Sequence, residues 1–580
     1  MRATYILNGI TTGLLTLFAL AAAGQTPAWT WAIQTEGALS EHVDQMVVAQ
    51  DGSIYVLGQF TDSFEFGDLV VTHPGAPGSG ARFLLKISST GEAEWAHTFE
   101  MNFTTAAYFI SPYALATDSE GNVYIAGGIV RVTATGAFEA EVGGMSLTIP
   151  SSAESGDSFI AKLDSEGIGV WAENLSTEEH PVLTNGDEII IDEFDRIYWS
   201  CNFLSYSYTL EINDEIHYSI GGEDNLTGSI LLMQLNTDGD FEWVRFIGSA
   251  SNDIGKGMVV AAGGGVFMSA AWNADTVYVA GLTAVNPDPL LTGNSDRWIA
   301  KIDHNGDAEW LIHEGGQGNQ GFARILGTPQ GGVIAFSRTI INASIILNEV
   351  EYSEPWGMLV TKYDETGTLE HVEFFPEMPW LQTLTTDGNG SYYLGFNFQA
   401  DAFSFSGFDF VNSGFGSSDF MVACIDESIA PVWAIALGAE ENDILRNLAF
   451  DHSNGLIAGG NFNSQNLIFG DHVLENSGLF TDDIFIAALD FATSIAAQPE
   501  LKQLRAYPNP ALSHLHFDLT SLKTRPYTAR VFDARGVPMK SMTVTGGEVA
   551  QMDVGGLEAG TYIILIQTTE DVFFSKFIKL

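Results

Sequence analysis

Few residues of this sequence stand at spacings that could support chemistry. His514 and His516 alternate on one expected strand and could act as a pair of metal ligands, but no third ligand accompanies them, which favours a surface strand. The segment 303–307 comes closest to a calcium loop, because Asp, Asn and Asp alternate around a Gly. An Asx turn at a hairpin tip explains that segment without a metal. The chain contains neither an HExxH nor a GxSxG motif.

A glycine-rich stretch at residues 316–321 matches the letters of the dinucleotide-binding fingerprint. The fingerprint requires a helix whose N-terminus faces the pyrophosphate. Residues 322–325 have the composition of a strand instead, so we interpret the stretch as a loop between two strands and predict no cofactor there.

The two cysteines, Cys201 and Cys424, fall in expected strands of different repeats. We predict two buried thiols rather than a disulfide, and two cysteines cannot build a zinc framework.

The chain is strongly acidic, with 23 Lys and Arg against 73 Asp and Glu and a formal net charge of -50. Binding to nucleic-acid phosphates requires cations, so a nucleic-acid partner is excluded. Two interpretations of the charge stay open: a solubilising surface suited to a salty medium, or carboxylate clusters that bind calcium.

One pattern recurs along most of the chain: an apolar run, an Asp-like residue, a turn with Gly, and then an aromatic residue. In the first six copies the Asp-like position precedes the aromatic residue or His by seven positions, as expected for a β-hairpin of constant length. The copies are Ser88…Trp95, Asp164…Trp171, Asn236…Trp243, Asp303…Trp310, Asp364…His371, Asp426…Trp433 and, without an aromatic residue, Asp490.

A second turn and strand precede each copy, so each repeat of about sixty to eighty residues contains four strands. Repeated four-stranded units with a recurring aromatic residue are typical of a β-propeller. Trp29 to Ile33 has the composition of a fourth strand with no partners before it, and the last repeat lacks its fourth strand. We therefore predict an all-β chain with a seven-bladed propeller over residues 27–495, closed by the N-terminal strand.

Several repeats carry an extra alternating segment between their second and third strands. The clearest examples are residues 64–68, 403–410 and 467–471, which we expect to form inserted hairpins. Their Phe residues either pack on the blade or form an exposed platform for sugar rings or a protein partner.

A charge register also repeats. Lys86, Lys162, Lys301 and Lys362 stand two residues before the Asp-like turn position, and Glu94, Glu309 and Glu370 follow three of them across the hairpin. We predict cross-strand ion pairs rather than a binding site.

Residues 1–24 have the features of a secretory signal peptide. An Arg near the start is followed by a short apolar stretch and small residues, which predicts cleavage near Ala23 or Gly24. The apolar core is too short for a membrane span, and we expect no transmembrane segment in the mature protein.

The C-terminal part reads as a separate domain. Residues 496–502 have the composition of a linker, and six short strands between 514 and 578 predict a small, Ig-like β-sandwich over residues 503–580.

Four segments of this domain resemble the C-terminal sorting domain of the type IX secretion system. The matching positions are Tyr507, Pro508, Asn509, Pro510, Arg535, Gly536, Gly560, Thr561, Tyr562, Lys576 and Lys579. The resemblance implies a bacterium of the Bacteroidota, contact with the type IX secretion machinery, and export to the cell surface or the medium. It also implies cleavage of the domain, followed by release of the cargo or its attachment to surface lipopolysaccharide.

No convergent catalytic set is apparent in the repeats. We expect a non-catalytic module that binds a polysaccharide or a protein at one end of the ring, without a cofactor unless calcium is bound. The alternative is a glycan lyase or hydrolase. Two inward Asp or Glu side chains about 5–10 Å apart at the channel mouth would favour the enzyme, whereas a mouth of Gly, Ser and backbone would favour the binder.

Overall fold

The computed structural model describes most of the chain outside its termini and several loops. The described residues are 27–73, 80–101, 108–134, 136–149, 156–175, 188–205, 209–212, 215–218, 227–249, 254–272, 274–286, 296–316, 323–339, 345–347, 350–352, 357–400, 402–412, 414, 416–451, 455–476, 478, 481–490, 500–520, 526–533, 538–567 and 571–580. They contain strands and no helix, so none of them forms a helix long and apolar enough to cross a membrane. The chain divides into two compact units, residues 28–490 and the remainder.

Residues 28–490 form consecutive antiparallel sheets of one plan, with four strands paired in order; the third sheet continues into two further strands, β23 (Thr276–Val279) and β24 (Leu282–Val285). We number these sheets one to seven in chain order.
The first strands are β3 (Glu41–Val48), β9 (Tyr108–Thr117), β15 (Glu188–Ile191), β21 (Ile254–Val260), β27 (Ala323–Gly327), β33 (Trp380–Thr386) and β39 (Asp443–Asp451). The second strands are β4 (Ile54–Thr61), β10 (Val123–Arg131), β16 (Ile197–Ser205), β22 (Val266–Trp272), β28 (Val333–Thr339), β34 (Tyr392–Phe398) and β40 (Gly455–Phe462). The third strands are β7 (Gly80–Ile87), β13 (Gly156–Leu163), β19 (Thr227–Leu235), β25 (Asp296–Ile302), β31 (Gly357–Tyr363), β37 (Asp419–Ile425) and β43 (Asp483–Asp490). The fourth strands are β8 (Ala93–Met101), β14 (Gly169–Leu175), β20 (Phe241–Ser249), β26 (Ala308–Glu314), β32 (Leu369–Pro376), β38 (Pro431–Leu437) and, for sheet seven, β1 (Ala28–Gln34).

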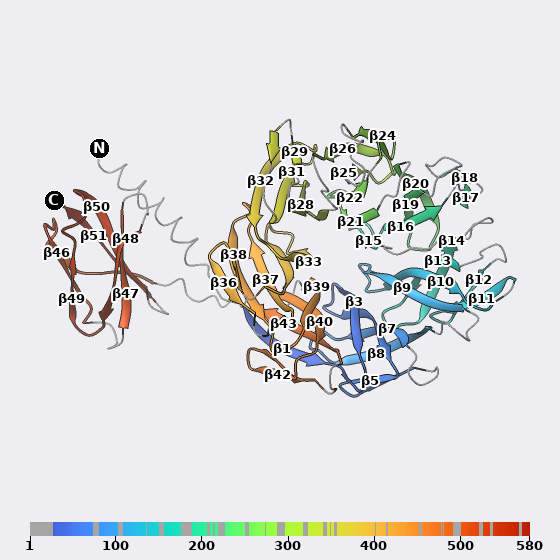
Figure 1. Cartoon of the computed structure of the whole chain (residues 1–580), viewed down its shortest axis with the longest axis horizontal. Helices are drawn as coiled ribbons and strands as arrows, with labels where there is room; N and C mark the ends of the chain where they lie inside the picture. The colour runs from blue at the N-terminus through green and yellow to red at the C-terminus, as the bar shows by residue number, and fades with distance from the viewer. Residues whose placement is uncertain are drawn as a thin grey trace. The chain divides into compact units, whose positions relative to one another are not determined.

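The sheets of residues 28–490 are arranged around a common centre, with the first strands nearest to it (Figure 1). Each first strand contacts the first strands of the two neighbouring sheets, and β39 of sheet seven contacts β3 of sheet one in the same way. The second and third strands are buried on both faces, which accounts for their continuous apolar sequences.

The N-terminal strand β1 lies beside the last strand of the repeats. It pairs antiparallel with β43, with Trp31 opposite Ala488 and Ile33 opposite Ile486. The short strand β2 (Glu36–Gly37) pairs with β5 (Ser63–Phe66) of the hairpin inserted in sheet one. Apolar residues of sheets one and seven share a single buried cluster.

Each sheet carries an inserted hairpin between its second and third strands, as expected for the three segments named above. The hairpins are β5 (Ser63–Phe66) with β6 (Leu69–Thr72), β11 (Phe138–Val142) with β12 (Met145–Ile149), β17 (Thr209–Ile212) with β18 (Glu215–Tyr218), β23 (Thr276–Val279) with β24 (Leu282–Val285), β29 (Ile345–Leu347) with β30 (Val350–Tyr352), β35 (Ala402–Phe405) with β36 (Phe408–Val411), and β41 (Asn466–Phe469) with β42 (His472–Glu475). Phe64, Phe66, Phe405 and Phe469 are buried, so these rings pack on the protein and form no platform.

The repeated Trp joins each of the first four sheets to the next one. The Trp95 indole Nε1 donates a 3.2 Å hydrogen bond to Ser165 O, and the ring packs against Gly167 in the turn of sheet two. The equivalent bonds run from Trp171 to Thr237 O at 2.9 Å, from Trp243 to His304 O at 2.9 Å and from Trp310 to Glu365 O at 3.0 Å. A recurring aromatic residue therefore marks a joint between sheets.

The same relation holds between β1 and sheet one. A Cβ added to Gly91, in the turn of sheet one, would lie 3.5 Å from Ile33 and 3.6 Å from Trp31. Trp31 thus occupies the position toward sheet one that Trp95 occupies toward sheet two.

The predicted charge register is confirmed. Lys86 and Lys301 bind Glu94 and Glu309 at 2.8 Å, and Lys362 lies 3.6 Å from Glu370. Lys162 contacts Asp118 of the first-to-second-strand turn at 3.3 Å instead. Lys86 and Lys162 are buried and Lys301 and Lys362 are half-buried, so the pairs support the structure.

The two cysteines are buried and form no disulfide, as predicted. Burial raises the pKa of the Cys424 thiol to about 12, which keeps it in the unreactive thiol form.

The C-terminal unit forms two small sheets, one of order β44-β51-β50-β47-β48 and one of order β45-β46-β49. The strands are β44 (Glu500–Gln503), β45 (Ala506–Tyr507), β46 (His514–Asp518), β47 (Pro526–Asp533), β48 (Pro538–Thr545), β49 (Val549–Asp553), β50 (Gly560–Gln567) and β51 (Asp571–Lys579). The unit has its own buried cluster, which includes Leu515, Ile564 and Phe577. Residues 500–502, which we expected in the linker, belong to β44 and pair parallel with β51.

Two glycines with the same backbone conformation allow the contribution of the Trp contact at a joint to be measured separately from backbone strain. Gly167 and Gly121 both have φ of +81°, but a Cβ at Gly167 would lie 2.7 Å from His97 Nε2 and 3.1 Å from Trp95, whereas a Cβ at Gly121 meets nothing within 4 Å. We expect Gly121→Ala to cost about 1 kcal/mol through backbone strain, and Gly167→Ala to cost about 1–3 kcal/mol more because the indole must move.

Urea unfolding followed by Trp fluorescence measures this difference, since every Trp precedes residue 434 and reports on residues 28–490 alone. Equal losses for the two variants would show that the Trp contact contributes nothing.

Candidate functional site

Several first strands carry a β-bulge at the same position near the centre of the ring of sheets. The pairing register shifts by one residue there in sheets one, two, four, six and seven. The extra residues are Asp44, Tyr113, Lys256, Gln382 and Arg446. A bulge redirects one side chain out of the alternation of the strand, so this position varies among sheets without disturbing their cores.

Three of these positions meet at a cavity of about 350 Å³. It is lined by His42, Val43 and Asp44 of β3, Gln59 of β4, Gln382 of β33 and Arg446 of β39. Imidazole, amide, carboxylate and guanidinium groups together supply hydrogen-bond donors and acceptors in several directions. The lining suits a ligand rich in hydroxyl groups, and we call it the central cavity.

Ion pairs hold two side chains of the central cavity. Arg82 Nη1 lies 2.6 Å from Asp44 Oδ2 and also donates to Pro112 O at 3.0 Å, which ties sheet one to sheet two. Burial raises the pKa of Asp44, and the Arg82 guanidinium partly offsets that rise. His42 Nδ1 lies 3.8 Å from Asp482 Oδ2, at the joint with sheet seven.

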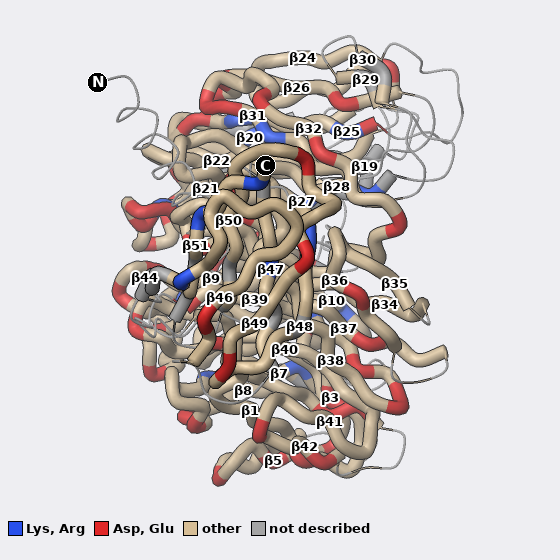
Figure 2. Tube along the Cα trace, turned by 90° about the vertical axis from the view of Figure 1, so that its left-hand side faces the viewer, with Lys and Arg blue, Asp and Glu red and all other residues tan. Residues whose placement is uncertain are grey.

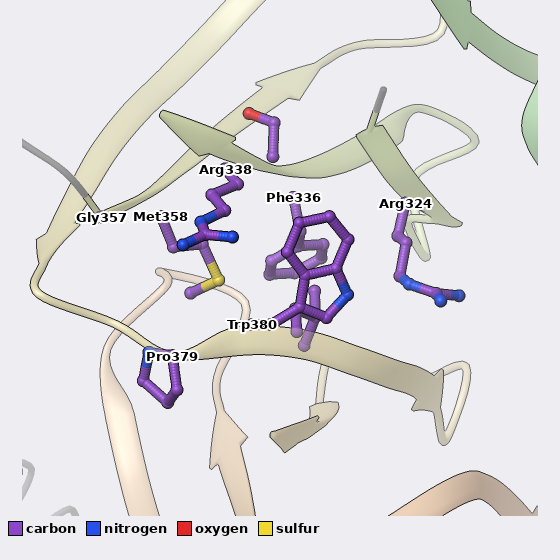
Figure 3. A pocket seen from close by; sticks show the side chains of 9 residues that line it. Arg324, Phe336, Arg338, Gly357, Met358, Pro379 and Trp380 are labelled. Atoms are coloured by element: carbon purple, nitrogen blue, oxygen red, sulfur yellow. The ribbon is translucent and has the colours of Figure 1, made fainter. Parts of the chain in front are cut away.

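A shallow groove lies between sheets five and six, one sheet away from Arg446. Trp380, the first residue of β33, is 45% exposed, and the Arg338 guanidinium stands 5.1 Å from the centre of its ring. Figure 3 shows the indole between Arg338 and Arg324, and all three residues line the groove. An exposed indole framed by cations offers a stacking surface for a ligand ring.

The lining matches neither of the two expectations stated for the channel mouth. The central cavity has one carboxylate, Asp44, and that group is already paired with Arg82, so the pair expected of a glycosidase is not found among the described residues. The mouth is also richer in polar side chains than the Gly- and Ser-lined mouth expected of a simple binder.

Carboxyl groups are buried close together at the joint beside the central cavity. Glu41 is fully buried, and its pKa is raised to about 9 by burial and by the nearby Asp483. Thr35 Oγ1 donates a 3.3 Å hydrogen bond to Glu41 Oε2. Asp443 at the joint of sheets six and seven has its pKa raised to about 6, mainly by burial, with Ser464 Oγ donating to it at 2.8 Å.

The residues singled out for metal binding have other partners. Asp303 Oδ1 accepts hydrogen bonds from the backbone N–H groups of Asn305 and Asp307, the geometry of an Asx turn. His516 stacks on Tyr507, with ring centroids 5.6 Å apart, and His514 contacts Ser513 Oγ at 2.9 Å. Among the described residues no three His, Cys, Asp or Glu side chains gather as a metal site.

The sorting-motif residues 507–510 hold the last strand of the chain. Asn509 Nδ2 donates to Lys576 O at 2.9 Å, and Ile578 N donates to Asn509 Oδ1 at 2.9 Å. Ala511 N donates to Ile578 O at 2.7 Å, and Leu580 N donates to Ala511 O at 3.0 Å. Two segments that lie at opposite ends of the domain in sequence are therefore joined by backbone hydrogen bonds.

The other sorting-motif residues lie on or beside the last strand. Gly560, Thr561 and Tyr562 begin β50, which pairs with β51, and Tyr562 stacks on Phe577 at 5.7 Å. Lys576 is exposed and Lys579 is buried. Arg535 and Gly536 lie outside the described residues, as do the expected cleavage positions Ala23 and Gly24 and most of the glycine-rich loop at 316–321.

Comparison with protein families decides the nature of the C-terminal unit. Residues 505–580 match the family described as "Secretion system C-terminal sorting domain". This unit is a sorting domain of the type IX secretion system. The resemblance derived from the motifs is confirmed, and the sorting domain indicates export to the cell surface or secretion by that machinery.

Solved structures are similar only distantly. The polysaccharide lyase Uly1 has a TM-score of 0.41 at 10% identity, over 81% of this chain and 93% of that one. A puromycin hydrolase has a TM-score of 0.35 at 10% identity, over 86% and 60%. The Synechocystis apocarotenoid oxygenase has a TM-score of 0.35 at 11% identity, over 81% and 95%. None of the curated proteins is detectably similar in sequence, so these likenesses carry no activity over to this chain.

Glu41 makes stability depend on pH. Its pKa lies at about 9 in the folded chain against an ordinary 4.5. Below pH 4.5 the Glu41 carboxyl is protonated in both the folded and the unfolded chain, and the folded state has its full stability. As the pH rises from 4.5 towards 9, the unfolded chain releases this proton while the folded chain keeps it, so the folded state loses stability. We expect Glu41→Gln, which stays neutral, to raise the melting temperature relative to the natural protein by an amount that grows with pH across this window.

Thermal unfolding at a series of pH values tests this expectation. Glu65→Gln, which removes a charge from an exposed position of β5, is the control. A constant difference between Glu41→Gln and the natural protein at all pH values would contradict a raised pKa.

The sorting domain also allows a test of export. Because residues 500–580 contain their own buried cluster, we expect a chain that ends at residue 499 to keep residues 28–490 folded but to remain in the periplasm. Cell fractionation locates the truncated chain, and limited proteolysis reports whether it is folded. Surface delivery of the truncated chain, or its failure to fold, would overturn the assignment.

Proposed function

We propose that residues 28–490 are a seven-bladed β-propeller closed by the N-terminal strand. Three observations support this reading: β1 completes the sheet of β39, β40 and β43, first strands of sheets seven and one are in contact, and Trp31 packs on Gly91. The strand β2 pairs with the inserted hairpin of sheet one, as the end of β20 pairs with that of sheet four. Closure of this kind leaves no open edge at the joint between the first and last blades.

The propeller is cargo of the type IX secretion system, and we propose that it works outside the cell as a non-catalytic glycan-binding module. The observation that carries the proposal is the central cavity, where bulges from three different sheets direct polar side chains into one space of about 350 Å³. Sugars are recognised by planar polar groups that hydrogen-bond hydroxyls and by aromatic faces that cover the ring. Gln59, Gln382 and Arg446 supply the first kind, and Trp380 in the neighbouring groove supplies the second.

We propose further that the sorting domain is removed after transport, leaving the propeller released or attached to surface lipopolysaccharide. The match to the sorting family supports this step.

A second candidate is a glycan lyase or hydrolase acting in the same cavity. His42 favours it, because the ring opens onto the central cavity while its Nδ1 lies near Asp482. A histidine oriented by a carboxylate is a suitable general base.

The binding proposal is tested with the full chain on a panel of soluble polysaccharides, by affinity electrophoresis and calorimetry. We expect at least one polysaccharide to bind, and we expect Gln382→Ala to weaken that binding about tenfold, because a buried hydrogen-bonding group is lost. Asn236→Ala, in a turn of sheet three away from the cavity, is the control. Absence of binding across the panel would refute the proposed function.

The same incubations distinguish the second candidate. Release of reducing ends, or absorbance from unsaturated sugar ends, that is lost in His42→Ala would show catalysis and replace the non-catalytic assignment. A bound polysaccharide that remains intact supports the binder.

A further inference from the structure

Arginine is concentrated around the centre of a strongly acidic molecule. Residues 28–490 contain eight arginines, and four of them, Arg82, Arg324, Arg338 and Arg446, lie at the central cavity or the adjoining Trp380 groove. The chain as a whole carries 73 acidic residues against 23 basic ones. Figure 2 shows the acidic positions spread over turns and strand ends throughout the trace.

Three of these arginines have an unused donor. The Nε atoms of Arg82, Arg324 and Arg446 are buried, and none of them has an acceptor among the described residues. Leaving a buried donor without an acceptor costs about 1–3 kcal/mol. Such a group in a folded protein calls for a specific explanation. Because these Nε atoms are shielded from solvent, a ligand would meet Arg446, which lines the central cavity, through the outer nitrogens of its guanidinium.

The carboxylates around these arginines do not neutralise them. Asp44 is bound by Arg82 at 2.6 Å, and Glu188 acts on Arg324, where burial lowers the pKa of the guanidinium and Glu188 opposes that shift. Arg446 is near enough to Asp44 to lower its pKa, but no carboxylate of the described residues forms an ion pair with Arg446. Arg82 is therefore paired with Asp44, whereas Arg446 brings into the central cavity a positive charge that no ion pair of the described residues takes up.

We propose that the ligand of the central cavity is an anionic glycan, whose carboxylate or sulfate groups are bound by Arg446. This inference rests on the proposed glycan-binding function and names the class of glycan. A guanidinium binds an oxyanion through two parallel N–H groups. The Trp380 indole lies on the side of Arg324 and offers a face to a neighbouring sugar ring.

The test uses two pairs of polysaccharides that differ only in charge. Polygalacturonate is compared with highly methyl-esterified pectin for the carboxylate, and dextran sulfate with dextran for the sulfate. We expect at least one anionic member to bind the full chain about tenfold or more tightly than its uncharged partner, and to weaken as salt is raised from about 50 to 500 mM. The pair that shows the difference identifies the anionic group.

Variants of Arg446 then locate the binding. We expect Arg446→Gln to weaken binding of the anionic member about tenfold or more, and Arg446→Lys to lose part of it, because lysine keeps the charge but not the forked donors. Arg245→Gln, which removes the same charge from a fourth strand where Arg245 binds Gly306 O, should bind as the natural protein does. Urea unfolding verifies that each variant is folded.

The outcomes separate the two proposals. If no polysaccharide of either kind binds, the glycan-binding function itself fails. If uncharged polysaccharides bind as tightly as the anionic ones, or if Arg446→Gln binds as well as Arg245→Gln, the function stands and the anionic ligand is refuted.

Discussion

The packing of an indole on a glycine turn of the next sheet is the contact on which the rest of residues 28–490 depends. A four-stranded antiparallel sheet with two apolar faces cannot be stable in water alone, so each sheet needs a neighbour at a defined distance. Trp95, Trp171, Trp243 and Trp310 set that distance with the same hydrogen bond to a turn carbonyl. The turn must contain Gly, because a Cβ would lie about 3 Å or less from a ring atom at Gly239, Gly306 and Gly367.

Because the Trp contacts that join the sheets are made by the fourth strands, the first strands can differ from one another in sequence. The buried clusters between sheets draw on all four strands, but the bulged residues of the first strands, such as Asp44 and Tyr113, are not among them. Evolution can therefore change the side chain at each bulge without cost to packing. Acid, tyrosine, amide and arginine occupy this position in different sheets, which is where the ring departs from its own repeat and where a binding site is expected.

The C-terminal unit is held together by a different set of contacts. Its first and last segments are joined by Asn509, which accepts from and donates to the backbone on both sides of Phe577. The two sheets enclose their own core, so the unit is structurally self-sufficient. Export is thus built into a part of the chain that shares no core with the part that we propose to bind a ligand.

The sequence alone determined the elements of this protein, because hairpin length, strand alternation and turn chemistry are local properties. The seven-residue interval between Asp303 and Trp310, the inserted hairpin at 403–410 and the sandwich strand Gly560–Gln567 all followed from patterns within a few residues. The sorting domain was recognisable for the same reason, since its motifs are short and ordered along the chain. Only residues 500–502 were misplaced, because a strand that pairs in parallel with the distant β51 has no local turn to announce it.

The tertiary structure decided where those elements meet, and the candidate site exists only there. His42 is hundreds of residues from Gln382 and Arg446, and the three belong to three sheets. No periodicity marks them. Gln382 and Arg446 are the bulged residues of their strands, His42 lies two residues before the bulged Asp44, and a bulge leaves no signature in an isolated sequence. Their convergence results from the contact of β39 with β3, which brings together the two ends of the repeat array and which spacing along the chain cannot reveal.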